Sequence, residues 1–156
     1  MQLVDLLSPG RTQAGLAITS KKRLLEHLAR MLAEDGDPEL TRIIFDGLVS
    51  REKMGSTGLG HGIAIPHGRI AADIAPVAAF VRLRDRIPFD AADGDGVDLI
   101  LAMVVPDHFS DQHLKLLALL AEMFDQGKVV ADLRAAPDDH SLYQVLADWR
   151  PKRGSG

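Results

Sequence analysis

Met54-Gly-Ser-Thr-Gly-Leu-Gly-His-Gly-Ile-Ala-Ile-Pro-His-Gly-Arg69 is the stretch around which the rest of this 156-residue chain is organised. Five of its residues are glycine, which permits positive φ and close approach of the backbone to a ligand. We therefore expect a loop with exposed N–H groups over 55–62, and then a brief buried strand over 63–65. Pro66 lacks an N–H and interrupts the strand ladder directly before His67. The pattern thus places an imidazole at a strand end, among residues that leave it unshielded.

The chemistry open to His67 follows from its ring. An unperturbed histidine has a pKa of about 6.5, so the ring is mostly neutral at pH 7 and is a competent nucleophile. Backbone N–H groups in a Gly-rich loop bind anionic oxygens. On the residues alone, His67 is either an ordinary loop histidine or the nucleophile or base of an anion-handling site.

The segment Gly62-Ile-Ala-Ile-Pro-His-Gly68 resembles the phosphorylation-site motif of the mannitol/fructose-class enzyme IIA domains of the bacterial phosphotransferase system. The approach to it, 51–60, is most similar to the nitrogen-type enzyme IIA, and the similarity runs from Leu6 to Tyr143. The resemblance implies that His67 accepts a phosphoryl group from the carrier HPr or its nitrogen-branch paralogue. His61 departs from the pattern, since nitrogen-type relatives carry Asn there, and its role is left open.

Further residues are assigned to the site. Arg51 is expected to end a helix at the entrance to the Gly-rich loop, where it meets either backbone carbonyls or, as the resemblance implies, phosphate oxygens. His113 falls in the first turn of a later helix. By itself it would be a solvent-facing residue, whereas the resemblance implies the second active-site histidine. We expect the phosphate-binding N–H groups to come from four glycines: Gly58, Gly60, Gly62 and Gly68.

Hydrophobic periodicity predicts the remaining elements. Two helices are expected early in the chain, one from Thr19 or Ser20 to about 36 and one from Asp37-Pro38 to about 52. A third is expected to begin at Ser110, with an apolar face at 114, 117, 120, 121 and 124. A short helix or turn over 129–133 and a last helix from Asp138 or Asp139 are expected to follow. Strands are expected over 76–83 and 97–105, with an edge piece over 87–90. The 97–105 run is almost continuously apolar, which predicts a central strand covered on both faces.

Together these elements predict a single α/β domain. The resemblance implies a mixed β-sheet flanked by helices on both sides, with an enzyme IIA type-2 domain over 1–150 and a disordered tail over 151–156. The basic run Lys21-Lys22-Arg23 falls in the first turn of a helix, the less favourable end for cations. It is expected to be a solvated face, with a partner contact as the alternative. His27 and His108 are expected at the surface.

Composition excludes several classes of function. A net charge of −4 argues against non-specific nucleic-acid binding, and the absence of cysteine removes disulfides and thiolate sites. The longest apolar run, 99–106, is far shorter than the roughly 18 residues that span a bilayer, so we expect no membrane insertion and a cytoplasmic protein. No cofactor or metal is expected: the acidic turn over 90–98 lacks EF-hand spacing, and His61, His67 and His113 match no zinc motif.

The resulting hypothesis is a phosphohistidine relay protein that acts mainly in regulation. Its expected partners are an HPr-type carrier and regulatory targets of the transporter or sensor-kinase type. One alternative is a sugar-specific enzyme IIA that passes phosphate to a transporter-linked enzyme IIB. A more distant alternative is a metal-dependent hydrolase.

Overall fold

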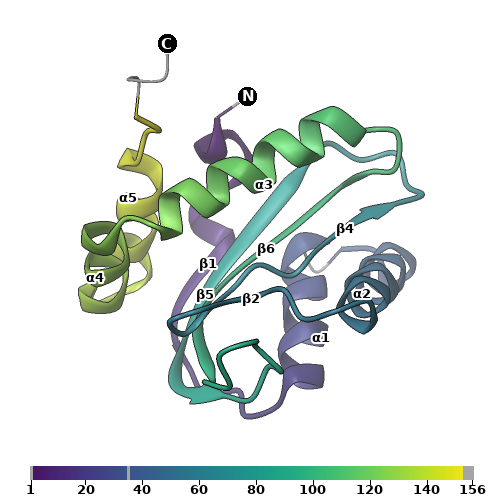
Figure 1. Cartoon of the computed structure of the whole chain (residues 1–156). Helices are drawn as coiled ribbons and strands as arrows, with labels where there is room; N and C mark the ends of the chain where they lie inside the picture. Colours follow the sequence, from purple (N-terminus) through teal and green to yellow (C-terminus); the bar gives the residue numbers. More distant parts are fainter. Residues whose placement is uncertain (1, 35, 153–156) are drawn as a thin grey trace.

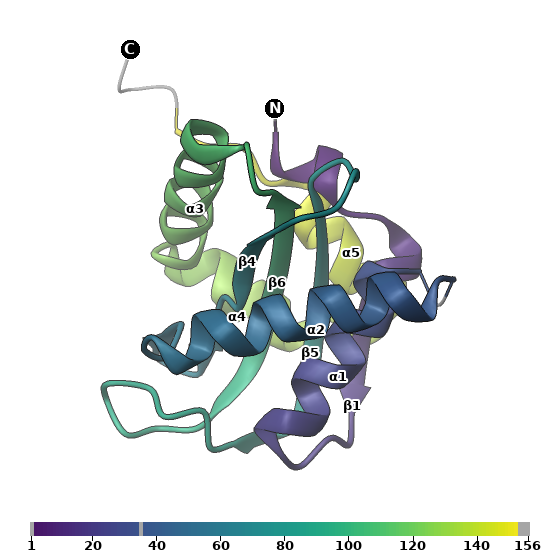
Figure 2. The ribbon, with the colours of Figure 1, turned by 90° about the vertical axis from the view of Figure 1, so that its right-hand side faces the viewer.

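The computed structural model describes residues 2–34 and 36–152, and over these it has a mixed sheet of six strands with helices on both faces (Figures 1 and 2). The predicted α/β architecture is therefore confirmed. Of the predicted tail, residues 153–156 lie outside the described residues. In chain order the elements are η1 (Leu3–Leu6), η2 (Pro9–Arg11), β1 (Thr12–Leu16), α1 (Lys21–Leu32), α2 (Pro38–Lys53), β2 (Gly58–Gly60), β3 (Ile63–Ala64), β4 (His67–Ile70), β5 (Val77–Ile87), β6 (Val97–Pro106), α3 (Ser110–Phe124), α4 (Gly127–Ala135) and α5 (Asp139–Asp148).

Strand β6 is the centre of the sheet, as predicted. It pairs antiparallel with β5 along one edge, and β3 and then β4 run parallel to it along the other. Because side chains alternate along a strand, Leu101 and Met103 pack under α3, α4 and α5, whereas Ile100 and Ala102 pack under α1 and α2. Burial on both faces explains the unbroken apolar sequence of this strand.

Helix starts follow the predicted capping residues, with one exception. The Ser20 hydroxyl accepts from the N–H of Arg23, and the Asp37 carboxylate accepts from the N–H of Glu39. The prediction that Ser110 caps α3 was wrong by one residue. Phe109 is the N-cap and makes no side-chain cap bond, while the Ser110 hydroxyl accepts from Arg69.

The edges of the sheet differ most from the predictions. β1, which the sequence did not indicate, adds a parallel strand beside β5. β5 continues through a polar segment to Ile87, which pairs with Val97, so the expected edge piece at 87–90 is not a separate strand. His27 is half-buried rather than exposed, because its ring lies 2.6 Å from Oε1 of Gln13 in β1.

Two glycines let α2 lie unusually close to β4. A Cβ added to Gly68 in β4 would lie 3.3 Å from the carbonyl oxygen of Gly47 in α2, and one added to Gly47 would lie 2.8 Å from Cγ2 of Ile70. Helix-interior glycine costs about 1 kcal/mol relative to alanine, so Gly47 is retained against local propensity. The close contact brings the C-terminal half of α2 over the strand that carries His67.

We expect Gly47→Ala to destabilise the protein by about 1 kcal/mol, although alanine favours helix. Overpacking a filled site costs about 1–3 kcal/mol, which exceeds the gain in helix propensity. Cγ2 of Ile70 cannot move away from the added methyl group, because it is bonded directly to the Cβ of a buried residue. Urea unfolding measures the change. Gly127→Ala in the first turn of α4, where an added Cβ meets nothing within 4 Å, is the control and should be neutral or stabilising. A Gly47→Ala protein as stable as the unmodified chain would contradict this account of the contact.

Candidate functional site

A hydrogen bond fixes the protonation pattern of His67, the first residue of β4. Its Nδ1 lies 2.7 Å from the carbonyl oxygen of Ile65. A carbonyl oxygen can only accept, so in the neutral ring the proton sits on Nδ1 and the lone pair is on Nε2. Pro66 supplies no N–H between them, and its own carbonyl accepts from the N–H of Met103 in β6. The backbone thus holds the ring in the tautomer that leaves the lone pair on Nε2.

The surroundings of His67 keep it neutral. The expectation that the neighbouring glycines leave the ring unshielded was wrong: the residue is only 8% exposed, and burial lowers its pKa. The hydrogen bond to Ile65 acts to raise the pKa, but the positive charge of Arg51 lowers it further, and the net shift is downward. A neutral imidazole at pH 7 is the form that can attack an electrophile.

His113 lies beside His67. It is in the first turn of α3, and its ring centroid is 5.3 Å from that of His67, with the planes inclined by 48°. Burial, followed by the charges of His67, Arg69 and Arg51, lowers the pKa of His113 to about 4. Its Nδ1 is buried and, within the described residues, has no hydrogen-bond partner. Leaving such an atom unpaired costs about 1–3 kcal/mol.

The two histidines line one open pocket of about 810 Å³. Its walls are the C-terminal half of α2, strand β4 and the first turns of α3, which adjoin in Figure 2. The charged lining consists of Arg51, Arg69, Asp46 and Asp107. On its rim lie two apolar side chains, Met54 at 82% exposed and Leu114 at 66%.

The exposure of Leu114 corrects a prediction. Helical spacing assigned it to the buried face of α3, but that face is formed by Leu116, Leu120, Met123 and Phe124. The buried stripe is rotated relative to the expected one. The exposed leucine instead contributes an apolar surface beside the two histidines.

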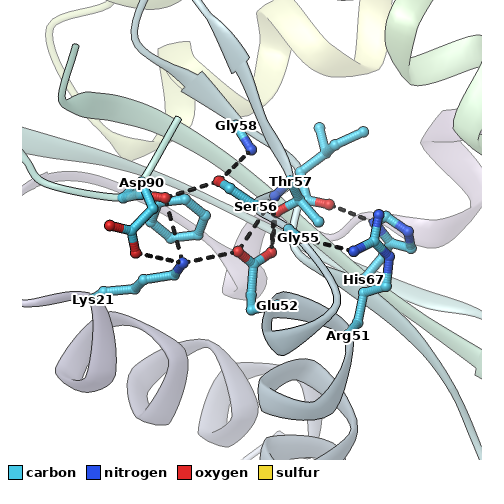
Figure 3. Close-up of polar contacts among 11 residues, drawn as sticks. Lys21, Arg51, Glu52, Gly55, Ser56, Thr57, Gly58, His67 and Asp90 are labelled. Carbon is cyan, nitrogen blue, oxygen red and sulfur yellow. Dashed lines mark hydrogen bonds and ion pairs between the residues drawn. The ribbon is translucent and has the colours of Figure 1, made fainter. Parts of the chain in front are cut away.

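Arg51 contacts a backbone carbonyl, which was one of its two predicted roles, and it also lies at the pocket. Its Nη1 donates to the carbonyl oxygen of Gly55 at 2.8 Å (Figure 3), and it also lines the pocket. A guanidinium has five N–H donors, so the bond to Gly55 does not exhaust it. Its charge acts on both histidines.

Of the four glycines expected to bind phosphate, only Gly68 lines the pocket. Gly58 and Gly60 bound β2, and β3 pairs with β6 at Leu99, whereas His67 pairs with Met103. Leu99 and Met103 are four residues apart along β6, a distance of about 13 Å. The structure therefore does not bring Gly58, Gly60 and Gly62 to the site.

Gly58, Gly60 and Gly62 instead belong to the hairpin formed by β2 and β3. His61 and Gly62, the two residues of its turn, have φ of 58° and 82°, and positive φ at both positions is the feature of a type I′ turn. Asn and His are enriched among non-glycine residues in this conformation. The exposed His61 donates its N–H to Asp93 and lies outside the pocket. The positive φ of the turn therefore accounts for a histidine at position 61.

Sequence reasoning missed Gly47, Arg69 and the buried pair Lys21–Glu52. A glycine inside a helix and a lysine at a helix N-terminus both oppose local preference, and those conflicts were the available signals. The described residues include no group of three His, Cys, Asp or Glu arranged to hold a metal ion. In the described part of the chain, no helix combines the length and apolar character needed to cross a bilayer.

Comparison with known proteins places these features in a family. The model of the family described as "Phosphoenolpyruvate-dependent sugar phosphotransferase system, EIIA 2" matches residues 5–149. A "Nitrogen regulatory protein" of Pseudomonas aeruginosa is 41% identical over 148 residues, covering 95% of this chain and 96% of that protein. One from Escherichia coli K12 is 39% identical over 149 residues, with 95% and 91% covered. The crystal structure of nitrogen regulatory protein IIA-Ntr from Neisseria meningitidis matches with a TM-score of 0.83 at 35% identity, covering 92% of this chain and 98% of that one.

The low pKa of His113 predicts a loss of stability in acid. In the unfolded chain histidine titrates near 6.5, whereas in the folded protein His113 titrates at about 4. Between these values the unfolded state binds more protons, so the free energy of unfolding falls as pH is lowered from about 6.5 to about 4. The lowered pKa of His67 acts in the same direction.

Urea unfolding at several pH values measures this loss. In His113→Gln, which has no titrating ring, we expect a smaller fall across the same window. His61→Asn changes an exposed histidine outside the pocket and should follow the unmodified protein. The same pH dependence with and without the His113 ring would contradict the assignment.

Proposed function

The chain belongs to the EIIA type-2 family of the phosphoenolpyruvate-dependent sugar phosphotransferase system, and we propose that it is a cytoplasmic phosphoryl-relay protein of the nitrogen regulatory type. Nε2 of His67 is the acceptor, and an HPr-type carrier is the donor. The observation that carries this proposal is the bond from Nδ1 of His67 to the Ile65 carbonyl, because it leaves Nε2 with the free electron pair.

The transfer balances without a further reactant. The Nε2 lone pair attacks phosphorus as the P–N bond to the donor's histidine breaks, and the electron pair of that bond returns to the donor ring. The proton on Nδ1 stays in place. As the His67 ring becomes positive, the Ile65 carbonyl stabilises that charge. Phosphoryl transfer of this kind has a loose transition state and depends on positioning and charge stabilisation.

The charges around His67 suit the transferred group. Arg51 and Arg69 line the pocket, and a guanidinium can bind phosphoryl oxygens through two parallel bonds. The first turn of α3, which begins at Ser110, adds the positive end of a helix dipole. His113 is neutral in this site and can donate a hydrogen bond to a phosphoryl oxygen from its protonated ring nitrogen without becoming the acceptor.

The rim of the pocket suits a protein donor. Met54 and Leu114 are large and exposed, and they line the same pocket as the histidines. Exposed apolar surface of this kind marks interaction sites. A carrier that covers the rim would exclude water from the transfer.

Regulation follows from the same surface. A phosphoryl group on His67 adds nearly two negative charges to the pocket that the apolar rim residues line, and this penalises any partner that buries that rim. The relatives at 39% and 41% identity carry the name nitrogen regulatory protein, which supports the regulatory reading over the sugar-specific alternative. Targets of the transporter or sensor-kinase type remain the expected partners. The alternative of a metal-dependent hydrolase is tested by measuring the metal content of the purified protein.

Incubation with phosphoenolpyruvate, enzyme I and an HPr-type carrier tests the relay. We expect intact-mass analysis to show one acid-labile phosphoryl group on the unmodified chain and none on His67→Ala. His113→Ala should still accept the group, but its transfer rate should fall by about tenfold or more, because a hydrogen-bond donor to the transferred oxygens is lost. His61→Asn is the control and should react normally. Phosphate that persists on His67→Ala would refute the acceptor.

The regulatory state is tested by comparing partners of two His67 variants. His67→Asp partly imitates the phosphorylated charge, whereas His67→Ala does not. We expect at least one target from lysate to bind His67→Ala about tenfold more tightly, or roughly 1.4 kcal/mol, and Leu114→Ser to weaken the same complex. Leu59→Ser removes an exposed leucine outside the pocket and serves as the control. Identical partners and affinities for both His67 variants would indicate a plain phosphate carrier.

A further inference from the structure

A buried carboxylate lies beside the site without lining its pocket. Glu52 is at the C-terminal end of α2, and its side chain is 5% exposed. Burying a charge is costly unless it is paired and hydrogen-bonded. Here the Thr57 N–H lies 3.3 and 3.2 Å from the two carboxylate oxygens, the Thr57 hydroxyl donates to one of them, and Lys21 Nζ lies 3.0 Å from the other (Figure 3).

Lys21 is placed to serve this carboxylate. It is the first residue of α1, where the helix dipole disfavours a cation, and the prediction that it belongs to a solvated face was wrong. Its side chain is 22% exposed, and Nζ also contacts the carbonyl oxygen of Phe89 at 3.3 Å and lies 4.3 Å from the centre of that ring. A cation held at the unfavourable end of a helix by several partners indicates a specific requirement for its charge.

The carboxylate is linked to His67 through the backbone. The carbonyl oxygen of Thr57 accepts from the N–H of Ile65 at 3.1 Å, and the carbonyl oxygen of Ile65 accepts from Nδ1 of His67 at 2.7 Å. Figure 3 shows the first links of this path, from Lys21 to Glu52 and from Glu52 to Thr57. Each link is a hydrogen bond or ion pair, so a displacement of Thr57 moves the group that selects the His67 tautomer.

We infer that Glu52, with Lys21 as its counter-charge, is a positioning residue for phosphoryl transfer to His67. It holds Thr57, and through Thr57 it fixes the Ile65 carbonyl that keeps the proton on Nδ1 and the lone pair on Nε2. The inference rests on the proposed function for its kinetic consequence, but its structural consequence, the His67 tautomer, can be observed without any phosphate.

A purely stabilising role explains the arrangement less well. Buried ion pairs are often no more stabilising than well-packed apolar residues of similar volume. An apolar pair could fill the space, but it could not accept from both the N–H and the hydroxyl of Thr57. The two acceptor oxygens of Glu52 constrain Thr57 in orientation as well as position, and that constraint is what the tautomer needs.

Glu52→Gln tests the inference, because it keeps the size of the side chain and removes its charge and one acceptor oxygen. In protein with ¹⁵N-labelled histidine, we expect the ring-nitrogen spectrum of His67 to show a second tautomer, with the proton on Nε2. With a phosphorylated HPr-type carrier at saturation, single-turnover transfer should slow by about tenfold, since small misplacements of reacting groups cost this much or more.

Asp90→Asn is the matched control. Asp90 also contacts Lys21, at 3.4 Å, but its side chain is 85% exposed. It has a φ of 59°, which asparagine tolerates. Removing its charge should leave both the His67 spectrum and the transfer rate unchanged.

A folded Glu52→Gln protein with a single Nδ1–H tautomer and the normal transfer rate would overturn the inference. If that variant does not fold, Thr57→Val, which removes only the hydroxyl bond to Glu52, should give the same changes in smaller measure, and an unchanged spectrum and rate would overturn it equally. Failure of the unmodified chain to accept phosphate would refute the proposed function instead, and the tautomer measurement would still decide the role of Glu52.

Discussion

The hydrogen bond from Nδ1 of His67 to the Ile65 carbonyl is the interaction on which the rest of the site depends. It selects one of the two neutral tautomers of the ring and leaves the lone pair on Nε2. The sheet holds the ends of this bond in place: Ile65 pairs with Thr57, and the Pro66 carbonyl accepts from Met103 in the central strand. A side-chain property is thereby set by backbone geometry, which a scaffold of paired strands keeps within narrow limits.

Helix α2 supplies the charged residues that surround this hydrogen bond. Gly47 and Gly68 allow the helix to approach β4, and its last turn then presents Arg51 to the pocket and Glu52 to the buried network. The two consecutive residues thus bind different residues of the loop that follows α2, Arg51 at Gly55 and Glu52 at Thr57. The arrangement has a stability cost, because it keeps a helical glycine, buried charges and two histidines whose pKa values are lowered. Costs of this type concentrate at functional sites.

Much of this could be predicted from the sequence where local and tertiary preferences agree. The apolar run of β6, the caps Ser20 and Asp37, and the placement of His67 at a strand end follow from one segment at a time. The rest depends on contacts between distant segments. β1 exists because β5 offers it an edge, Gly60 and Gly62 serve a hairpin turn, and Lys21 pairs with the buried Glu52. Periodicity alone could not distinguish a buried leucine from Leu114, which is exposed at the rim of the pocket.

The central claim is that the fold determines which nitrogen of His67 reacts. Protein with ¹⁵N-labelled histidine, phosphorylated by a carrier, can be examined by correlation spectra of the ring nitrogens and their coupling to phosphorus. The account predicts phosphorus bonded to Nε2, with the proton still on Nδ1 and in its bond to the Ile65 carbonyl. Phosphorus bonded to Nδ1 would contradict it, because that nitrogen could react only if the hydrogen bond on which the site depends were broken.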